Sequence, residues 1–210
     1  MTSAPRPASA SGRAARREKI RKRLLIAIED ALEAGSTYND LTVGWLVAEA
    51  KISRATFYTY FEDKGDLLSA LSEHVVSDMV DAGRHWWSIP PEATKADLRK
   101  AVQPLCDSYR RYRALWGAVV ESAAYDVRVR DQYEQTVQKA IAALAEHIRA
   151  GQESGSITRD LDPDDAAAWI TWMGERGMHQ LVSPGSDEQA DRQAGALTDV
   201  LWKLLYDGCR

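Results

Sequence analysis

The stretch LTVGWLVAEAKISRATFYTYFEDKGDLL, residues 41–68, predicts two short helices joined by a tight turn and followed by the start of a third helix. In its first part, apolar residues recur at helical spacing and are expected to face a core. They are Val43, Leu46, Val47 and Ala50. Ser53 is placed to cap a second helix over residues 54–60. The pattern therefore predicts a helix-turn-helix over residues 42–61.

The second of these helices has a face of small, polar and aromatic side chains, with little to bury. The face consists of Arg54, Ala55, Thr56, Tyr58 and Tyr60. A helix-turn-helix presents such a face to the major groove of DNA. Arg54 can reach guanine O6 and N7, and the methyl groups of Ala55 and Thr56 can contact thymine. The alternative is an ordinary helical corner of a core, in which the tyrosines are filler.

The same stretch resembles the N-terminal domain of TetR/AcrR-type transcriptional regulators. The resemblance rests on T-V at 42–43, A at 50, I-S at 52–53, T-F-Y at 56–58, Y-F at 60–61, K at 64 and L-L at 67–68. It implies a DNA-binding set in which several side chains hold phosphates and set the register. The set is Thr42, Ser53, Arg54, Ala55, Thr56, Tyr58, Tyr60 and Lys64. The family usually has glycine in the turn where Lys51 stands, and a left-handed backbone there costs a non-glycine residue about 1 kcal/mol.

Composition favours a modest globular protein of the cytoplasm. Of the 210 residues, 45% are hydrophobic and 28% are charged, which are globular values. No apolar run approaches the roughly 20 residues that span a bilayer, and the N-terminus lacks the apolar core of a signal peptide. The two cysteines, Cys106 and Cys209, form neither a disulfide framework nor a metal-type spacing. We therefore expect no membrane segment, no metal and no cofactor.

Charge is distributed unevenly along the chain. Residues 1–23 carry eight basic side chains and one acidic one, although the net charge of the whole chain is −4. A basic arm beside a helix-turn-helix attracts phosphates and makes the affinity for DNA fall with salt. The alternative is a solvated tail that only aids solubility. Residues 1–14, rich in Ala, Ser, Pro and Arg, are expected to be disordered without a partner.

The remaining pattern predicts an all-α protein of about nine helices and no strand. Three parts are expected: a disordered basic arm over 1–14, a helix-turn-helix domain over 15–62 and an effector-binding and dimerisation domain over 63–210. Gly35 is expected to end a first helix over 16–34, and Asp63 to cap a long fourth helix that Pro90 and Pro91 end. Later helices are expected over 94–111, 113–125, 127–152, 163–182 and 187–207. Pro104 is expected to kink the first of them, and Asp162 to cap the fourth ahead of Pro163.

Aromatic residues gather in the C-terminal part, which holds six of the seven tryptophans. Such residues suit a pocket for an apolar or amphipathic small molecule, although each can also be plain core packing. The segment Trp172-Met173-Gly174-Glu175-Arg176 resembles the penultimate helix of the EthR-like subgroup, where a Met-Asn-Glu-Arg element borders a hydrophobic tunnel. Gly174 stands where asparagine is usual. The candidate ligand-binding residues are Leu105, Tyr109, Trp116, Val120, Tyr133, Val137, Trp172 and Met173.

The last two helices carry apolar stripes that favour a homodimer. The stripes are Trp169, Ile170, Met173, Leu181 and Val182 on one helix, and Ala194, Leu197, Leu201, Leu204 and Leu205 on the other. Two such helices paired across a twofold axis form a four-helix interface. The alternative is that both stripes close the core of the monomer. Two half-sites on one face of a duplex require a protein with two recognition helices, which favours the dimer.

Together these patterns predict a sequence-specific regulator of transcription that binds a palindromic operator and a small hydrophobic ligand. The resemblance to the family implies a repressor that the ligand releases from the operator, although activation would use the same motif. Two other classes compete with it. An enzyme would need a catalytic constellation, but the four histidines are isolated, and Asp164 and Asp165 sit at a helix start, where the helix dipole explains them. A helical protein–protein adaptor would bind DNA with little preference among sequences.

Overall fold

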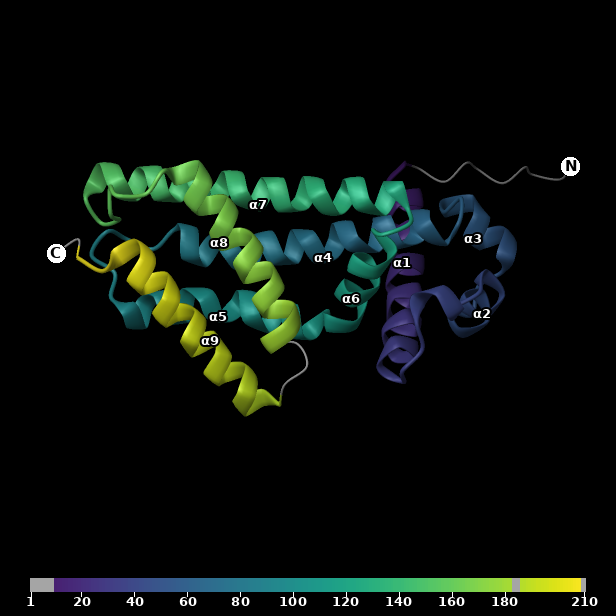
Figure 1. The fold of residues 1–210 in the computed structure, drawn as a ribbon. Coiled ribbons are helices and arrows are strands. Elements are labelled where there is room, and N and C mark those ends of the chain that lie inside the picture. Colours follow the sequence, from purple (N-terminus) through teal and green to yellow (C-terminus); the bar gives the residue numbers. More distant parts are fainter. Residues whose placement is uncertain (1–9, 183–185, 209–210) are drawn as a thin grey trace, which may run out of the picture. The chain divides into compact units, whose positions relative to one another are not determined.

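The computed structural model describes residues 10–182 and 186–208, and every regular element in this part of the chain is helical (Figure 1). The chain divides into two compact units, Met1–Leu71 and Ser72–Arg210. The expected all-α class with about nine helices is confirmed, since α1 to α9 account for the described α-helices. The two units are described separately below.

The first unit is built from α1 (Ala10–Glu33), η1 (Tyr38–Asp40), α2 (Val43–Glu49), α3 (Arg54–Tyr60) and the beginning of α4 (Lys64–Trp87). Its core consists of fully buried apolar side chains from each helix. They include Leu24, Ile28, Leu46, Phe57, Phe61, Leu67 and Leu68. Leu24 and Ile28 lie four residues apart on α1, and the leucines at the start of α4 follow a similar helical spacing, so each helix turns an apolar face to this core.

Helix α1 begins earlier than the sequence pattern predicts. It starts at Ala10, inside the segment 1–14 that was expected to be disordered, while residues 1–9 lie outside the described part of the chain. The residues from 10 to 19 are mainly Ala, Arg, Lys and Glu, which have high helix propensity and extend the helix; those whose burial the structure describes are exposed or half-buried.

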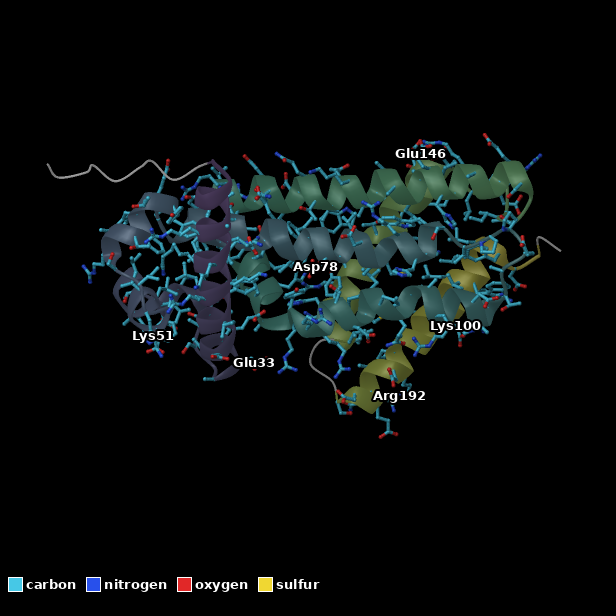
Figure 2. All side chains as sticks on the ribbon, turned by 180° about the vertical axis from the view of Figure 1, so that it is seen from behind. Glu33, Lys51, Asp78, Lys100, Glu146 and Arg192 are labelled. Carbon is cyan, nitrogen blue, oxygen red and sulfur yellow. The ribbon has the colours of Figure 1, made fainter. Side chains whose placement is uncertain are left out.

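The turn between α2 and α3 is a Schellman motif with lysine at its left-handed position. Lys51 has φ 52°, its N–H donates to Ala48 O, and the N–H of Ile52 donates to Val47 O. These two hydrogen bonds satisfy carbonyls at the end of α2. Figure 2 labels Lys51, whose side chain is exposed. The departure from glycine therefore leaves the expected turn shape intact, with a backbone strain stored at one residue.

The second unit contains the rest of α4 and five further α-helices: α5 (Lys95–Arg111), α6 (Arg113–Ser122), α7 (Val127–Ser154), α8 (Pro163–Gly177) and α9 (Asp187–Leu201). Short π-helical segments, η2 (Met178–Val182) and η3 (Trp202–Tyr206), extend α8 and α9. Helix α8 packs against α7, and α9 packs against α5 (Figure 1). Asp162 accepts hydrogen bonds from the N–H groups of Asp164 and Asp165, so the expected cap ahead of Pro163 is present.

Helix α4 belongs to both units. Its residues Leu67, Leu68 and Leu71 are buried in the first unit, and Val75 is buried in the second. The boundary between the units therefore lies inside a continuous helix and later than the 62/63 boundary expected from the sequence. No glycine or proline interrupts the helix near residue 71, which explains why it continues. Asp78, which is labelled in Figure 2, lies on α4. Its carboxylate accepts a hydrogen bond of 2.5 Å from the hydroxyl of Tyr112, the residue before α6.

A buried polar network joins the end of α4 to α7 and η3. The indole N–H of Trp86 donates to the hydroxyl of Tyr206 (3.0 Å), which lies 2.8 Å from Nε2 of His147. Nδ1 of His147 lies 3.2 Å from the carbonyl oxygen of Trp87, which can only accept, so His147 carries its proton on Nδ1. Nε2 then accepts from Tyr206. Every member has a partner, and burial lowers the pKa of His147, so the histidine is held neutral.

Candidate nucleic-acid interface and ligand cavity

Each helix of the helix-turn-helix starts at a residue whose side chain caps it. The hydroxyl of Thr42 accepts from the N–H of Trp45 (3.1 Å), and the hydroxyl of Ser53 accepts from the N–H of Thr56 (3.0 Å). The hydroxyls of Ser53 and Thr56 also lie 2.9 Å apart. Each cap satisfies a backbone donor that the helix itself leaves open. Two of the eight predicted DNA-binding residues, Thr42 and Ser53, therefore also define where α2 and α3 begin.

Helix α3 has one buried anchor and a broad exposed face. Phe57 is fully buried and packs edge-on against Tyr58, with ring centroids 5.3 Å apart. Tyr58 itself is 57% exposed, and Arg54 and Ala55 are exposed beside it. Tyr60 is half-buried. A large aromatic side chain left in solvent next to an arginine and two small residues suits contact with a nucleic-acid groove.

Gly44 gives the guanidinium of Arg54 a place to lie. A Cβ at Gly44 would stand 2.8 Å from Nη2 of Arg54, so the arginine crosses the first turn of α2 at the point where α2 lacks a side chain. The sequence pattern did not single out Gly44. A glycine within the first turn of a short helix, ten residues before the arginine, is the only local signal that could have indicated it.

Lys64 is tied to the loop before α2 rather than extended into solvent. Its ammonium donates to the carbonyl oxygens of Asn39 (2.9 Å) and Tyr38 (3.2 Å) and lies 5.4 Å from the centre of the Tyr38 ring. The hydroxyl of Tyr38 donates in return to the carbonyl of Lys64 (2.6 Å). Burial lowers the pKa of Lys64, and the nearby Asp40 opposes that shift. An ammonium has three donors, so one remains for another acceptor.

The basic cluster expected near the N-terminus lies partly on α1. Arg16, Arg17 and Lys19 are exposed, whereas Arg21 forms an ion pair with Glu18 at 2.8 Å. Arg6 lies outside the described residues. The described part of the cluster is therefore a helical surface, not an extended arm.

The second unit encloses an apolar cavity of about 900 Å³, part of it continuous with solvent. Every α-helix of this unit contributes to the lining. The lining residues are Val76, Met79, Val80, Gly83, Trp86, Trp87, Val102, Leu105, Tyr109, Trp116, Thr136, Val137, Ala140, Leu144, Ile170, Thr171, Gly174, Glu175, Met178, Leu197 and Leu201. An apolar lining with few polar groups is typical of small-molecule sites.

Four of the eight predicted ligand-binding residues line this cavity: Leu105, Tyr109, Trp116 and Val137. Val120, Tyr133, Trp172 and Met173 do not. Trp172 and Met173 are both more than 40% exposed. The reason is the phase of α8, whose cavity-facing residues Thr171, Gly174 and Met178 follow the spacing of three and four. The two residues after Thr171 point to the other side.

The contribution of α4 to the cavity was missed from the sequence. Its residues from Val76 to Trp87 supply six lining positions, and the indole N–H of Trp87 is buried without a hydrogen-bond partner. The apolar stripe on α4 was visible in the sequence, but a stripe that packs in a core and a stripe that borders a cavity have the same period.

A chain of aromatic rings runs from the cavity to the outer face of α8. Ring centroids are 5.7 Å apart for Tyr109 and Trp116, 5.7 Å for Trp116 and Tyr133, and 6.2 Å for Tyr133 and Trp172. The carboxylate of Glu175 lies beside this chain. Burial, then the charge of Glu175, raise the pKa of both Tyr109 and Tyr133. Tyr133 is thus the link between the cavity and exposed Trp172, although it does not line the cavity.

Two other kinds of site find no support in the described part of the chain. There, no group of three or more His, Cys, Asp or Glu side chains is arranged to hold a metal ion. No helix in that part is both long enough and apolar enough to cross a bilayer.

The architecture is that of a helix-turn-helix transcriptional regulator with a cavity in its second unit. Two family models match: the N-terminal model of the bacterial regulatory proteins of the tetR family over residues 36–71, and the C-terminal domain of the transcriptional regulator EthR over residues 98–207. The chain therefore belongs to the TetR family of transcriptional regulators and has a C-terminal domain of the EthR type.

Similar proteins agree with this placement. The HTH-type transcriptional regulator EthR of Mycolicibacterium smegmatis is 26% identical, over 98% of this chain and 96% of its own. EthR of Mycobacterium tuberculosis is 28% identical, over 86% and 83%.

Among solved structures, a putative TetR-family regulator from Mesorhizobium loti has a TM-score of 0.70 at 16% identity, over 95% of this chain and 100% of its own. A putative regulator from Saccharomonospora viridis, in complex with choline, has a TM-score of 0.70 at 19% identity, over 92% and 99%. These likenesses support the fold.

Proposed function

We propose that this protein is a cytoplasmic repressor that binds a palindromic operator as a homodimer and leaves it when a small hydrophobic or amphipathic ligand occupies the cavity. The observation that carries the proposal is the pairing of two features in one chain. A capped helix in the first unit exposes Arg54, Ala55 and Tyr58, and the helices of the second unit line an apolar cavity.

The operator-binding roles follow from the exposed groups. Arg54 reads guanine by a bidentate contact, while the methyl groups of Ala55 and Thr56 contact thymine. Four hydroxyl groups lie near the DNA phosphates and set the register of the protein on the duplex. They belong to Thr42, Ser53, Tyr58 and Tyr60. Lys64 adds its remaining donor to a phosphate, and its two bonds to the loop carbonyls hold the ammonium in position.

Helix α4 is the element through which a ligand acts on the operator. It begins in the first unit and supplies six lining residues of the cavity in the second. A ligand that binds one position of α4 better than another shifts the population of the two states. A 100-fold preference for the state that does not fit the operator weakens DNA binding by about 2.7 kcal/mol.

The homodimer uses the outer faces of α8, η2, α9 and η3. Exposed apolar side chains on these elements are Trp169, Trp172, Met173, Leu181, Val200 and Leu204. Other members of the predicted stripes, such as Ile170, Ala194 and Leu201, are buried within the protomer. Each stripe therefore has two sides, one that closes the protomer and one that is available to a second copy.

The test is a selection from random DNA duplexes with purified full-length protein at near-physiological salt. A palindrome should be enriched, with half-sites about one helical turn, or multiples of it, apart. A protein–protein adaptor would instead retain duplexes without preference, and that outcome would refute the operator-binding role.

Two substitutions distinguish recognition of the base sequence from contact with the phosphates. Arg54→Ala should weaken operator binding by roughly 5- to 150-fold and relax the preference at one base pair, because a bidentate contact to guanine discriminates by about 1–3 kcal/mol. Tyr58→Phe should weaken operator and random DNA alike, because a phosphate contact carries no sequence information. Equal losses on both DNAs for Arg54→Ala would remove its base-reading role.

A further inference from the structure

The described lining of the cavity carries a negative charge and no positive charge. Glu175 is the only acidic residue of the lining, and among the residues whose side chains the structure describes no Lys, Arg or His lines the cavity. Glu175 is half-buried, and no ion pair to it forms within that described set. A carboxylate held beside an apolar cavity without a counter-charge is costly, and a ligand of opposite charge would offset that cost.

The rings next to Glu175 are the groups that stabilise a cation. Tyr109 and Trp116 line the cavity in edge-to-face contact, and Tyr133 packs on Trp116 and shares the field of Glu175. The faces of Trp and Tyr attract ammonium groups within about 6 Å of their centres, and sets of such rings bind quaternary ammonium ligands. Gly174 leaves space beside Glu175, because a Cβ at this position would meet no atom within 4 Å.

We propose that the cavity selects an organic cation: an alkylated ammonium group with an apolar tail, with the ammonium between Glu175 and the rings of Tyr109 and Trp116. The tail lies along the apolar lining from α4, α5 and α7. This inference rests on the proposed ligand-binding function of the cavity and names the class of ligand.

Other charges on α8 do not cancel Glu175. Arg176 is absent from the cavity lining, and its effect on Tyr133 is the weakest of those acting on that hydroxyl. The carboxylate of Glu175 lies close enough to the Tyr133 hydroxyl that, after burial, its charge is the main cause that raises the pKa of this hydroxyl. A fatty acid or another anionic amphiphile would place a second negative charge beside the first, and like charges in a site of low dielectric repel strongly.

The test is calorimetric titration of the full-length protein with three ligands of one chain length: octyltrimethylammonium, 1-octanol and octanoate, all as monomers. The ammonium ligand should bind the wild type, and Glu175→Gln should weaken that binding about 10-fold or more. The affinity for 1-octanol should stay unchanged, because glutamine keeps the size of the side chain and 1-octanol carries no charge. Octanoate should bind the wild type most weakly and improve in Glu175→Gln.

A control and a second variant keep the result decisive. Glu121→Gln, an exposed position on α6 outside the lining, makes the same change in net charge and should leave all three affinities unchanged. Tyr109→Leu removes a ring that lines the cavity and should weaken the ammonium ligand more than 1-octanol, whether or not Glu175→Gln folds. If 1-octanol binds the wild type but the ammonium ligand does not, or is insensitive to both substitutions, the cation proposal is overturned. If none of the three ligands binds, the cavity itself is not a ligand site, and the proposed function loses its effector.

Discussion

At the scale of single residues, the turn of the helix-turn-helix shows how a local departure from a pattern can be quantified. Lys51 is the only described non-glycine residue with positive φ, at 52°. A side chain in this conformation brings Cβ close to the following carbonyl oxygen, which costs about 1–2 kcal/mol. We expect Lys51→Gly to raise the free energy of unfolding by about 1 kcal/mol, since glycine also adds some freedom to the unfolded chain. Urea unfolding measures the change.

The control for this prediction is Lys51→Ala. Alanine removes the charge and the long side chain but keeps Cβ, so it should give no gain in stability. A gain for alanine equal to that for glycine would show that the lysine charge, not the backbone conformation, is the source of the cost.

A second residue, His147, should make stability depend on pH. Burial lowers its pKa in the folded protein below the ordinary value of 6.5. As the pH falls through 6.5, the unfolded chain takes up a proton at this position and the folded chain does not, so the folded state loses stability. The loss ends once the pH falls below the lowered pKa, and the contribution is fully present above pH 6.5.

The measurement is the free energy of unfolding of the wild type and of His147→Gln, from pH 8 to pH 5. Glutamine does not titrate and can accept from the Tyr206 hydroxyl, so the difference between the two proteins isolates this histidine. It should shrink as the pH falls below 6.5. A difference that stays constant over this range would mean that His147 titrates alike in both states.

Residues differ in how far the sequence reveals their roles. Ser53 and Asp162 are caps in the structure as predicted, because a cap depends on three or four consecutive residues. The contact between Gly44 and Arg54 depends on how two helices meet, and the half-buried state of Lys64 depends on a loop 25 residues before it. No local pattern encodes either contact.

At the scale of helices, two glycines in similar settings should respond in opposite ways. Gly151 in α7 and Gly174 in α8 both occupy helices, where alanine is usually better by about 0.5–1 kcal/mol. A Cβ at Gly151 would lie 2.5 Å from Cγ1 of buried Ile157 and 2.9 Å from its Cβ, whereas one at Gly174 meets no atom within 4 Å.

We therefore expect Gly151→Ala to destabilise the protein by about 1–3 kcal/mol, because the branched side chain of Ile157 cannot move aside without repacking. Gly174→Ala should stabilise it by about 0.5–1 kcal/mol. Thermal or urea unfolding of the two variants gives both numbers. Similar changes of the same sign would mean that helix propensity, and not the contact with Ile157, dominates.

Helix positions were more predictable than helix faces. The starts of α5 and α8 and the end of α4 follow caps and prolines in the sequence, so the expected ranges are close to the observed ones. Trp172 and Met173 were assigned to the cavity from a resemblance, and the phase of α8 turns both outward. A helix with apolar residues on two sides has no unique inward face until its neighbours are placed.

At the scale of the whole molecule, the remaining question is what covers the apolar outer face of the second unit. Trp169 on α8 is 79% exposed, the highest value among the large apolar side chains described. Leu181 and Leu204 are exposed on the segments that extend α8 and α9. Exposed apolar residues of this size on adjacent elements mark an interaction surface. A second copy of the chain is the occupant that a palindromic operator requires.

Trp169→Glu should therefore raise the dissociation constant of the dimer by about 30-fold or more, since a central interface tryptophan contributes about 2 kcal/mol or more and a buried lone carboxylate adds to the loss. Sedimentation equilibrium measures the constant directly. The matched control is Val127→Glu, which introduces the same charge at an apolar position 58% exposed at the start of α7. It should leave the dimer intact.

Because half-sites are bound together only by a dimer, Trp169→Glu should also bind a full palindrome no better than a single half-site. If both substitutions shift the association equally, the interface lies elsewhere, and the last two helices serve only to close the protomer.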